Sequence, residues 1–128
     1  MKQSTMEWIE KAEGDWDVAQ RVYRARKKTN YDAACFHVQQ CVEKYLKARL
    51  NEVGIVFDKT HNLSDLLDIL LPIEPTWTPL RPVVHPFTKY AILYSYPGYN
   101  ATRIEAKTVL ADCCEARRVI RATFGLPV

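Results

Sequence analysis

The sequence has no long apolar run. Its longest stretch without a charged side chain, from Tyr90 to Thr102, contains serine, proline, glycine and asparagine. A membrane-spanning helix needs about 20 mostly apolar residues, so none is predicted. The N-terminal segment also lacks the basic start and the apolar centre of a signal peptide. We therefore expect a cytoplasmic protein.

Recognisable cofactor and metal motifs are missing as well. The chain has four glycines and no glycine-rich phosphate loop, and its four cysteines show no CxxC spacing. The three histidines do not combine with cysteine or aspartate in a metal-site pattern, and no pair of carboxylates has a catalytic spacing. These patterns predict no metal, no cofactor and no catalytic residue. We interpret the cysteines as small buried side chains.

The charge balance does not point to one class of partner. The chain has 18 basic and 15 acidic side chains, a formal net charge of +3, which does not by itself indicate a nucleic-acid-binding protein. In the first 28 residues the acidic side chains precede the basic ones. That order complements a helix dipole without any ligand.

Apolar residues recur at helical spacing along nearly the whole chain, and no strand pattern competes. We predict an all-α fold: an up-and-down bundle of four to five helices, formed as a single domain over residues 1–128. The pattern predicts helices over about 5–28, 31–53, 63–71, 86–94 and 102–124.

Local signals refine this prediction. Ser4 or Thr5 is expected to cap the first helix. Five prolines between residues 72 and 86 indicate either an ordered loop or an interrupted helix. In the helix predicted to start at Pro86, the inward side chains are expected to be Phe87, Ala91 and Tyr94.

The second predicted helix is apolar on two faces. One stripe consists of Ala34, Val38, Cys41, Tyr45 and Ala48, and the other of Cys35, Val42, Leu46, Leu50 and Val53. The remaining arc is a polar wedge of His37, Gln40, Lys44, Lys47 and Asn51. A helix with two apolar faces must pack on both sides, and in a small domain a partner chain supplies the second contact most easily. We therefore predict a homodimer.

The polar wedge is the first candidate for a nucleotide-binding site. His37, Gln40 and Lys44 share one edge of the helix, with Lys47 next in the series, and together they offer an imidazole, an amide and ammonium groups to a phosphate or a base. A hydrogen-bonded strip at a dimer seam is the alternative. His61 is a second candidate because it precedes a predicted helix N-terminus, where anions are favoured. A capping role for Thr60 or His61 is the alternative there.

Tyr96 is the last candidate. It lies in a turn with four tyrosines within ten residues, and exposed rings in such a turn can stack on bases. The alternative is that these rings pack in the core with their hydroxyl groups at its edge.

Two blocks of the sequence resemble the HEPN (higher eukaryotes and prokaryotes nucleotide-binding) domain. The first runs from Tyr31 to Ala48 and includes Phe36-His37-Val38-Gln39-Gln40, and the second is Lys59-Thr60-His61-Asn62-Leu63 followed by Leu66-Leu67. Both occur in the order and at the separation of that family, and the resemblance covers nearly the whole chain. It implies a helical bundle related to the C-terminal domain of kanamycin nucleotidyltransferase. It also implies a dimer and, in prokaryotes, a small nucleotidyltransferase as partner in a toxin–antitoxin pair.

The resemblance does not carry a catalytic motif onto this chain. Many HEPN relatives are metal-independent ribonucleases with an arginine and a histidine four to six residues apart, whereas Arg81 and His85 here have three residues between them. Relatives of this short type also have an arginine before the Tyr-Pro of the turn. Here Ser95 precedes Tyr96-Pro97, so a cationic phosphate contact is missing.

These observations favour a non-enzymatic module that binds nucleotide or RNA, or docks a nucleotidyltransferase, through His37, Gln40, Lys44 and Lys47. One alternative is a ribonuclease with a displaced site, in which Arg81 and His85, or His37 across a dimer, act on RNA. The other is a purely structural adaptor that dimerises. The three alternatives make different predictions for RNA binding and RNA cleavage.

Overall fold

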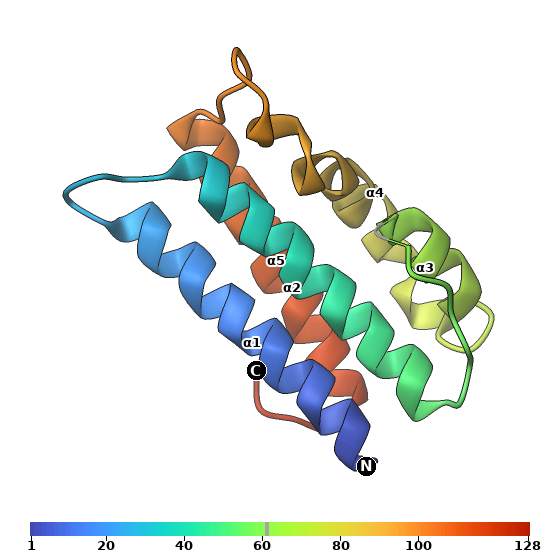
Figure 1. Cartoon of the computed structure of the whole chain (residues 1–128). Coiled ribbons are helices and arrows are strands. Elements are labelled where there is room, and N and C mark those ends of the chain that lie inside the picture. Colours follow the sequence, from blue (N-terminus) through green and yellow to red (C-terminus); the bar gives the residue numbers. More distant parts are fainter. Residues whose placement is uncertain (61) are drawn as a thin grey trace.

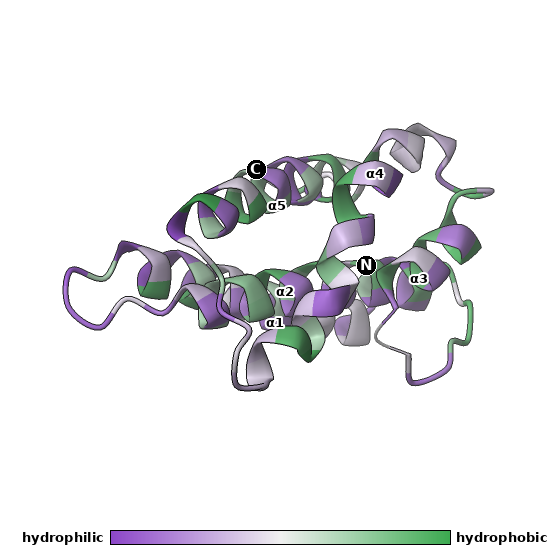
Figure 2. Cartoon of the chain, turned by 90° about the horizontal axis from the view of Figure 1, so that it is seen from above, coloured by the Kyte–Doolittle hydropathy of each residue, from purple (hydrophilic) through white to green (hydrophobic). Residues whose placement is uncertain are grey.

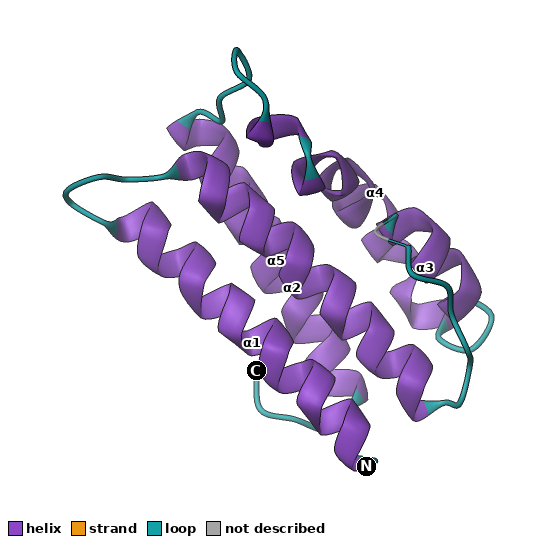
Figure 3. Cartoon of the chain, in the orientation of Figure 1, coloured by secondary structure: helices purple, strands orange, loops and turns teal. Residues whose placement is uncertain are grey.

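The computed structural model describes residues 1–60 and 62–128, and every regular element in these ranges is helical, as predicted (Figure 3). Most of the helical residues belong to three long helices, and the remainder form short turns. The α-helices are α1 (Gln3–Arg24), α2 (Tyr31–Glu52), α3 (Leu63–Leu70), α4 (Arg81–Val84) and α5 (Arg103–Thr123). The 3₁₀ segments are η1 (Pro75–Leu80), η2 (His85–Ala91) and η3 (Leu93–Ser95).

Helix α2 lies at the centre of the molecule. Figure 1 shows α1 beside it on one side, α3 and α4 on the other, and α5 behind, and α2 contacts α1, α3, α5 and η2. Figure 2 shows that hydrophilic and hydrophobic residues alternate along the long helices. This is the pattern of helices that turn one face to a core and the other to solvent.

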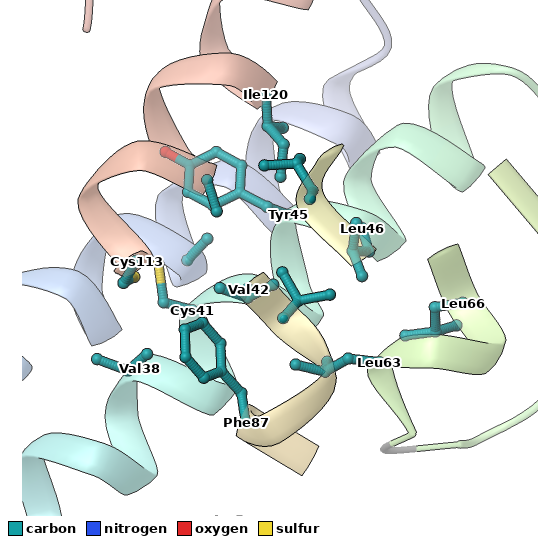
Figure 4. Close-up of a cluster of buried hydrophobic side chains, with 14 of the residues drawn as sticks. Val38, Cys41, Val42, Tyr45, Leu46, Leu63, Leu66, Phe87, Cys113 and Ile120 are labelled. Carbon is teal, nitrogen blue, oxygen red and sulfur yellow. The ribbon is translucent and has the colours of Figure 1, made fainter. Parts of the chain in front are cut away.

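Both apolar stripes of α2 are buried within one chain. In Figure 4, Val42 and Leu46 lie near Leu63 and Leu66 of α3, while Cys41 and Tyr45 lie near Cys113 and Ile120 of α5. All predicted stripe residues except Val53 are buried. The reason given above for a homodimer is therefore wrong, because α3, α5 and η2 supply the second contact. The homodimer itself stays a prediction.

The predicted start and end of α1 are wrong. The N-cap residue is Lys2, which makes no side-chain cap, while Thr5 is buried and donates a hydrogen bond from Oγ1 to Glu52 Oε1 at 2.9 Å. The helix ends at Arg24 instead of residue 28. Lys28 has φ +55°, a left-handed conformation that cannot continue a helix. The caps of α2 and α3 are Asn30 and Asn62, whose side chains accept hydrogen bonds from Ala33 N and Asp65 N.

The proline-rich segment is an interrupted helix, one of the two alternatives left open above. Prolines have no N–H and disturb the preceding turn, so short 3₁₀ pieces and the single turn of α4 replace a regular helix. The helix predicted over 86–94 is therefore wrong in type. Phe87 is buried as predicted, but Ala91 and Tyr94 are only partly buried, and Tyr90 is the second buried ring.

Across the ranges that the structure describes, no helix is both long enough and apolar enough to span a bilayer.

Candidate functional site

The predicted polar wedge faces α1, where two of its cationic side chains share one carboxylate. His37 Nδ1 lies 2.8 Å from Asp15 Oδ1, and Lys44 Nζ donates to Asp15 Oδ2 at 2.5 Å. Asp15 is 9% exposed, whereas about a quarter of each basic side chain is accessible. The structure therefore brings His37 and Lys44 together at the α1–α2 seam, and their outer edges remain accessible.

The sequence alone does not identify Asp15 as the partner of His37 and Lys44, because it is one of several acids in α1. Its spacing from the buried Ala12 and Ala19 nevertheless places it on the inward face of the helix. An acid three residues after one buried alanine and four before another falls on the inward face. That register was the available signal for a carboxylate directed at the neighbouring helix.

The contact with Asp15 defines what the His37 ring can do. A carboxylate at Nδ1 favours a proton on Nδ1, so Nε2 accepts a hydrogen bond when the ring is neutral and donates one to an anion when the ring is protonated. The same pairing orients the ring. The arrangement suits two chemical roles, hydrogen bonding to a ligand and acceptance of a proton.

The other two wedge residues are arranged differently. Gln40 is partly buried and donates from Nε2 to Gln39 Oε1 at 2.6 Å. Lys47 is buried and donates to Glu43 Oε2 at 3.0 Å. Its Nζ also lies 5.8 Å from the ring centroids of both Trp8 and Phe57. Lys47 is thus enclosed by aromatic rings, and the structure does not place it at the accessible edge with His37 and Lys44.

A pocket of about 290 Å³ lies at the N-terminal end of α2, where it is lined by residues of α2, η2 and η3 and by none of the polar-wedge residues. Phe36 connects the two features, because its ring lines the pocket and lies edge-on to the His37 ring with centroids 5.2 Å apart. Tyr90 and Tyr94 line the same pocket as a stacked pair, with centroids 5.6 Å apart. The remaining wall includes Asn30, Asp32 and Ser95. The pocket is aromatic and polar.

Tyr94 is fixed in this wall by its hydroxyl group. Burial, followed by the hydrogen bond that its OH donates to Glu105 Oε2 at 2.8 Å, raises the pKa of Tyr94 well above 10. The hydroxyl therefore stays protonated at physiological pH. The ring is held as a neutral surface on which a planar group can stack.

Tyr96, another predicted site residue, lies apart from this pocket. Tyr96 is 61% exposed and lines a different hollow, formed with Lys89, Ile92, Leu93 and Tyr99. His61 lies outside the described residues. The prediction that the exposed turn carries accessible tyrosines applies to Tyr96 and Tyr99, while Tyr90 packs in the core.

The last helix directs two of its basic side chains inward. Arg117 donates two hydrogen bonds to Glu13 of α1, and Arg121 donates to the Tyr45 hydroxyl at 3.1 Å. Tyr45 in turn donates to Glu13 Oε2 at 2.6 Å. Burial raises the pKa of Glu13, but the bonds from Arg117 and Tyr45 outweigh it, so the net pKa lies below 4.5. These arginines serve the packing of three helices.

Across residues 1–60 and 62–128, no three or more His, Cys, Asp or Glu side chains come together in a group that could hold a metal ion.

Comparison with known proteins gives a consistent result. The sequence profile of the HEPN domain matches residues 5–122. No curated protein matches the chain. The crystal structure of TT1696 from Thermus thermophilus is 24% identical and has a TM-score of 0.81, over 94% of this chain and 98% of that one. ST0689, an archaeal HEPN homologue, is 23% identical and has a TM-score of 0.66, over 96% and 98% of the two chains. At these identities the two structures support the fold.

Proposed function

The chain belongs to the HEPN domain family, and from that premise we propose that it is a single-domain nucleotide- or RNA-binding module that partners a small nucleotidyltransferase in a toxin–antitoxin pair. The observation that carries the binding role is the Asp15–His37 contact beside the aromatic pocket. It offers an oriented imidazole and a partly accessible ammonium next to rings on which a base can stack.

The proposed ligand contacts follow from these positions. The base enters the pocket against Phe36 and Tyr94, and a phosphate reaches the outer edge of His37 and Lys44. Gln40 lies one helical turn from both and supplies an amide. Because Asp15 already bonds to both basic groups, a phosphate must compete with a carboxylate for them, and weak binding is expected.

We also propose that the chain forms a homodimer, through a part of the molecule away from the polar wedge. Four large apolar side chains near the turn before α5 are more than half exposed: Ile92, Tyr96, Tyr99 and Ile104. Exposed apolar side chains gathered in one region mark contact surfaces. We assign the homodimer contact to this turn, with Tyr96 in the interface.

Fluorescence anisotropy with a labelled oligoribonucleotide tests the binding role. The double variant H37A/K44A is expected to weaken binding at least several-fold, because both phosphate contacts are removed. Lys107→Ala on α5 is the matched control, since it removes one exposed positive charge elsewhere. Equal binding by the wild type and H37A/K44A contradicts the proposal. Copurification with the product of an adjacent nucleotidyltransferase gene tests the partner separately.

A second candidate function rests on the same histidine. An imidazole oriented by a carboxylate is a suitable general base for the 2′-hydroxyl of RNA, so metal-independent RNA cleavage is the alternative. Incubation of RNA with the protein in the presence of a chelator distinguishes the two. Cleavage that disappears in His37→Ala supports a ribonuclease, whereas intact RNA bound by the wild type supports the binding module.

A further inference from the structure

A groove on the other side of α2 has no role in the function proposed above. It lies between the start of α3 and the α4–η2 segment, which Figure 1 shows on the side of α2 away from α1. Two adjoining hollows of about 550 and 600 Å³ form it, and they share Ser64 and His85. The other lining residues include Asn62, Arg81, Pro82, Pro86 and Lys89.

Three basic side chains recur along one edge of this groove. Arg81, His85 and Lys89 are four residues apart in a nearly continuous run of helical turns, and all three are exposed. Arg81 and His85 line one of the two hollows, and His85 and Lys89 line the other, so the three side chains follow the groove from end to end. The groove therefore has a row of basic groups that are available to an anion.

The contacts made by Arg81 and Lys89 leave both side chains able to bind an anion. Arg81 forms an ion pair with Asp68, and both side chains are about half exposed, so the pair is weak and open to exchange. Lys89 Nζ lies 5.3 Å from the Tyr90 ring centroid, a contact that leaves its N–H donors accessible. Arg81 and Lys89 are both exposed, in contrast to Lys47, which is buried between two aromatic rings.

The polar side chains of α3 complete the groove and hold its geometry. Ser64 Oγ and His85 Nδ1 are 2.9 Å apart, which orients the ring and leaves Nε2 for a ligand. Asn62 uses its oxygen to cap α3, so its NH₂ group remains a donor. Leu63 N donates to Thr88 Oγ1 at 3.1 Å and fixes η2 against α3. The donors thus lie on two elements that are bonded to each other.

We propose that this groove is a second anion site, which binds a phosphate group of a phosphate ester. Arg81 and Lys89 supply the charge, and directed hydrogen bonds come from the Asn62 amide and from the Ser64–His85 pair, which donates through Nε2 when Ser64 donates to Nδ1 and through the Ser64 hydroxyl when Nδ1 donates to Ser64. The pyrrolidine rings of Pro82 and Pro86 form an apolar wall for the organic part of the ester. The site is independent of the His37–Lys44 edge, because α2 lies between them.

NMR titration of the ¹⁵N-labelled protein tests the proposal, first with inorganic phosphate and then with uridine monophosphate and oligouridylate. Phosphate is expected to shift the amide signals of Ser64, His85 and Lys89. The double variant R81Q/K89Q is expected to weaken binding about tenfold, the loss that corresponds to about 1.4 kcal/mol. Both side chains are exposed, so the circular dichroism spectrum should not change.

The control variant is R103Q/K107Q, which removes the same charge from exposed positions of α5. An equal loss in this variant, or shifts spread over all basic regions, shows only diffuse attraction and overturns the proposal. H37A/K44A should leave the groove signals unchanged, so failure of the function proposed above is distinguishable from failure here. Tighter binding of oligouridylate than of phosphate identifies an RNA strand as ligand, and equal binding identifies a single phosphate group; both support the site.

Discussion

Glu13 and Arg117 meet through two nearly parallel hydrogen bonds, 2.7 and 2.6 Å long, across 104 residues of sequence. The same carboxylate accepts a hydrogen bond from Tyr45. One acidic side chain of α1 therefore holds α2 and α5 in place. A bidentate, partly buried pair of this kind is stronger than an exposed ion pair, because both partners are oriented and less well solvated.

Glu13→Gln is expected to lower the free energy of unfolding by about 2 kcal/mol, because charge-assisted hydrogen bonds to Arg117 are lost. Urea unfolding followed by circular dichroism measures the change. Glu115→Gln is the matched control. Glu115 bonds to Arg118 on an exposed surface, so a much smaller loss is expected. Equal effects of the two substitutions would contradict the assigned role of Glu13.

The same carboxylate predicts how stability depends on pH. The pKa of Glu13 is lower in the folded protein than its ordinary value of 4.5. Its contribution is therefore fully present above pH 4.5 and is lost as the pH falls through the lower, folded value. Unfolding curves between pH 7 and pH 3 should show a smaller loss of stability in Glu13→Gln than in the wild type. Identical slopes would show that other acids account for the whole dependence.

Phe87→Ala is expected to cost about 3–4 kcal/mol, because this ring is 1% exposed and its removal leaves a cavity between η2 and α2. Val56→Ala, in the loop after α2, is the control. Its side chain is 95% exposed, and its loss should change stability by less than about 0.5 kcal/mol. Thermal unfolding of both variants is the measurement. A small effect of Phe87→Ala would mean that the proline-rich segment is not part of the cooperative core.

Asp15→Asn is expected to tighten the binding of a mononucleotide about fivefold, because the carboxylate that competes with phosphate for His37 and Lys44 is removed. Isothermal titration at low salt measures the dissociation constant. The size and shape of the side chain are kept, so the contact surface of α1 remains. Weaker binding by this variant would show that Asp15 orients the site instead of competing for it.

The cysteines should differ sharply in reactivity. Cys114 is exposed, whereas Cys35, Cys41 and Cys113 are fully buried. Burial also raises the pKa of the Cys35 thiol to about 12 and that of Cys41 well above 9, which keeps both as unreactive thiols. A thiol reagent should modify one cysteine quickly in the native protein and four in denaturant. Cys114→Ser should abolish the fast reaction, and any remaining fast thiol would contradict the packing of α2 on α5.

Much of the fold could be predicted because the apolar pattern of the long helices is regular. The bounds predicted for α2 agree with the structure to within one residue, and its stripes were identified by position. The end of α1 could not be predicted, because Arg26, Lys27 and Lys28 suit a helix as well as a loop. The proline-rich segment could not be predicted in detail, because hydrogen bonds between residues three apart (3₁₀) and four apart (α) compete there. The packing of Phe87 and Trp77 in the core decides between the two forms.

Only part of the candidate site could be predicted from the sequence. The wedge on α2 follows from its own periodicity, so His37 and Lys44 could be grouped. Their partner Asp15 could not be assigned, because the rotation of α1 against α2 decides which acid meets them. Lys47 belongs to the same series by spacing, yet Trp8 of α1 and Phe57 of the loop after α2 enclose it, and neither contact follows from the periodicity of α2.

The central position of α2 also constrains how the chain is made. Helices α1 and α2 are joined by residues 25–30 alone and can pair as soon as they leave the ribosome. The stripe of α2 that faces α5 then stays uncovered until residue 123 has been synthesised. The nascent hairpin therefore exposes an apolar surface until α5 docks on it, and exposed surface of this kind makes folding intermediates prone to aggregate.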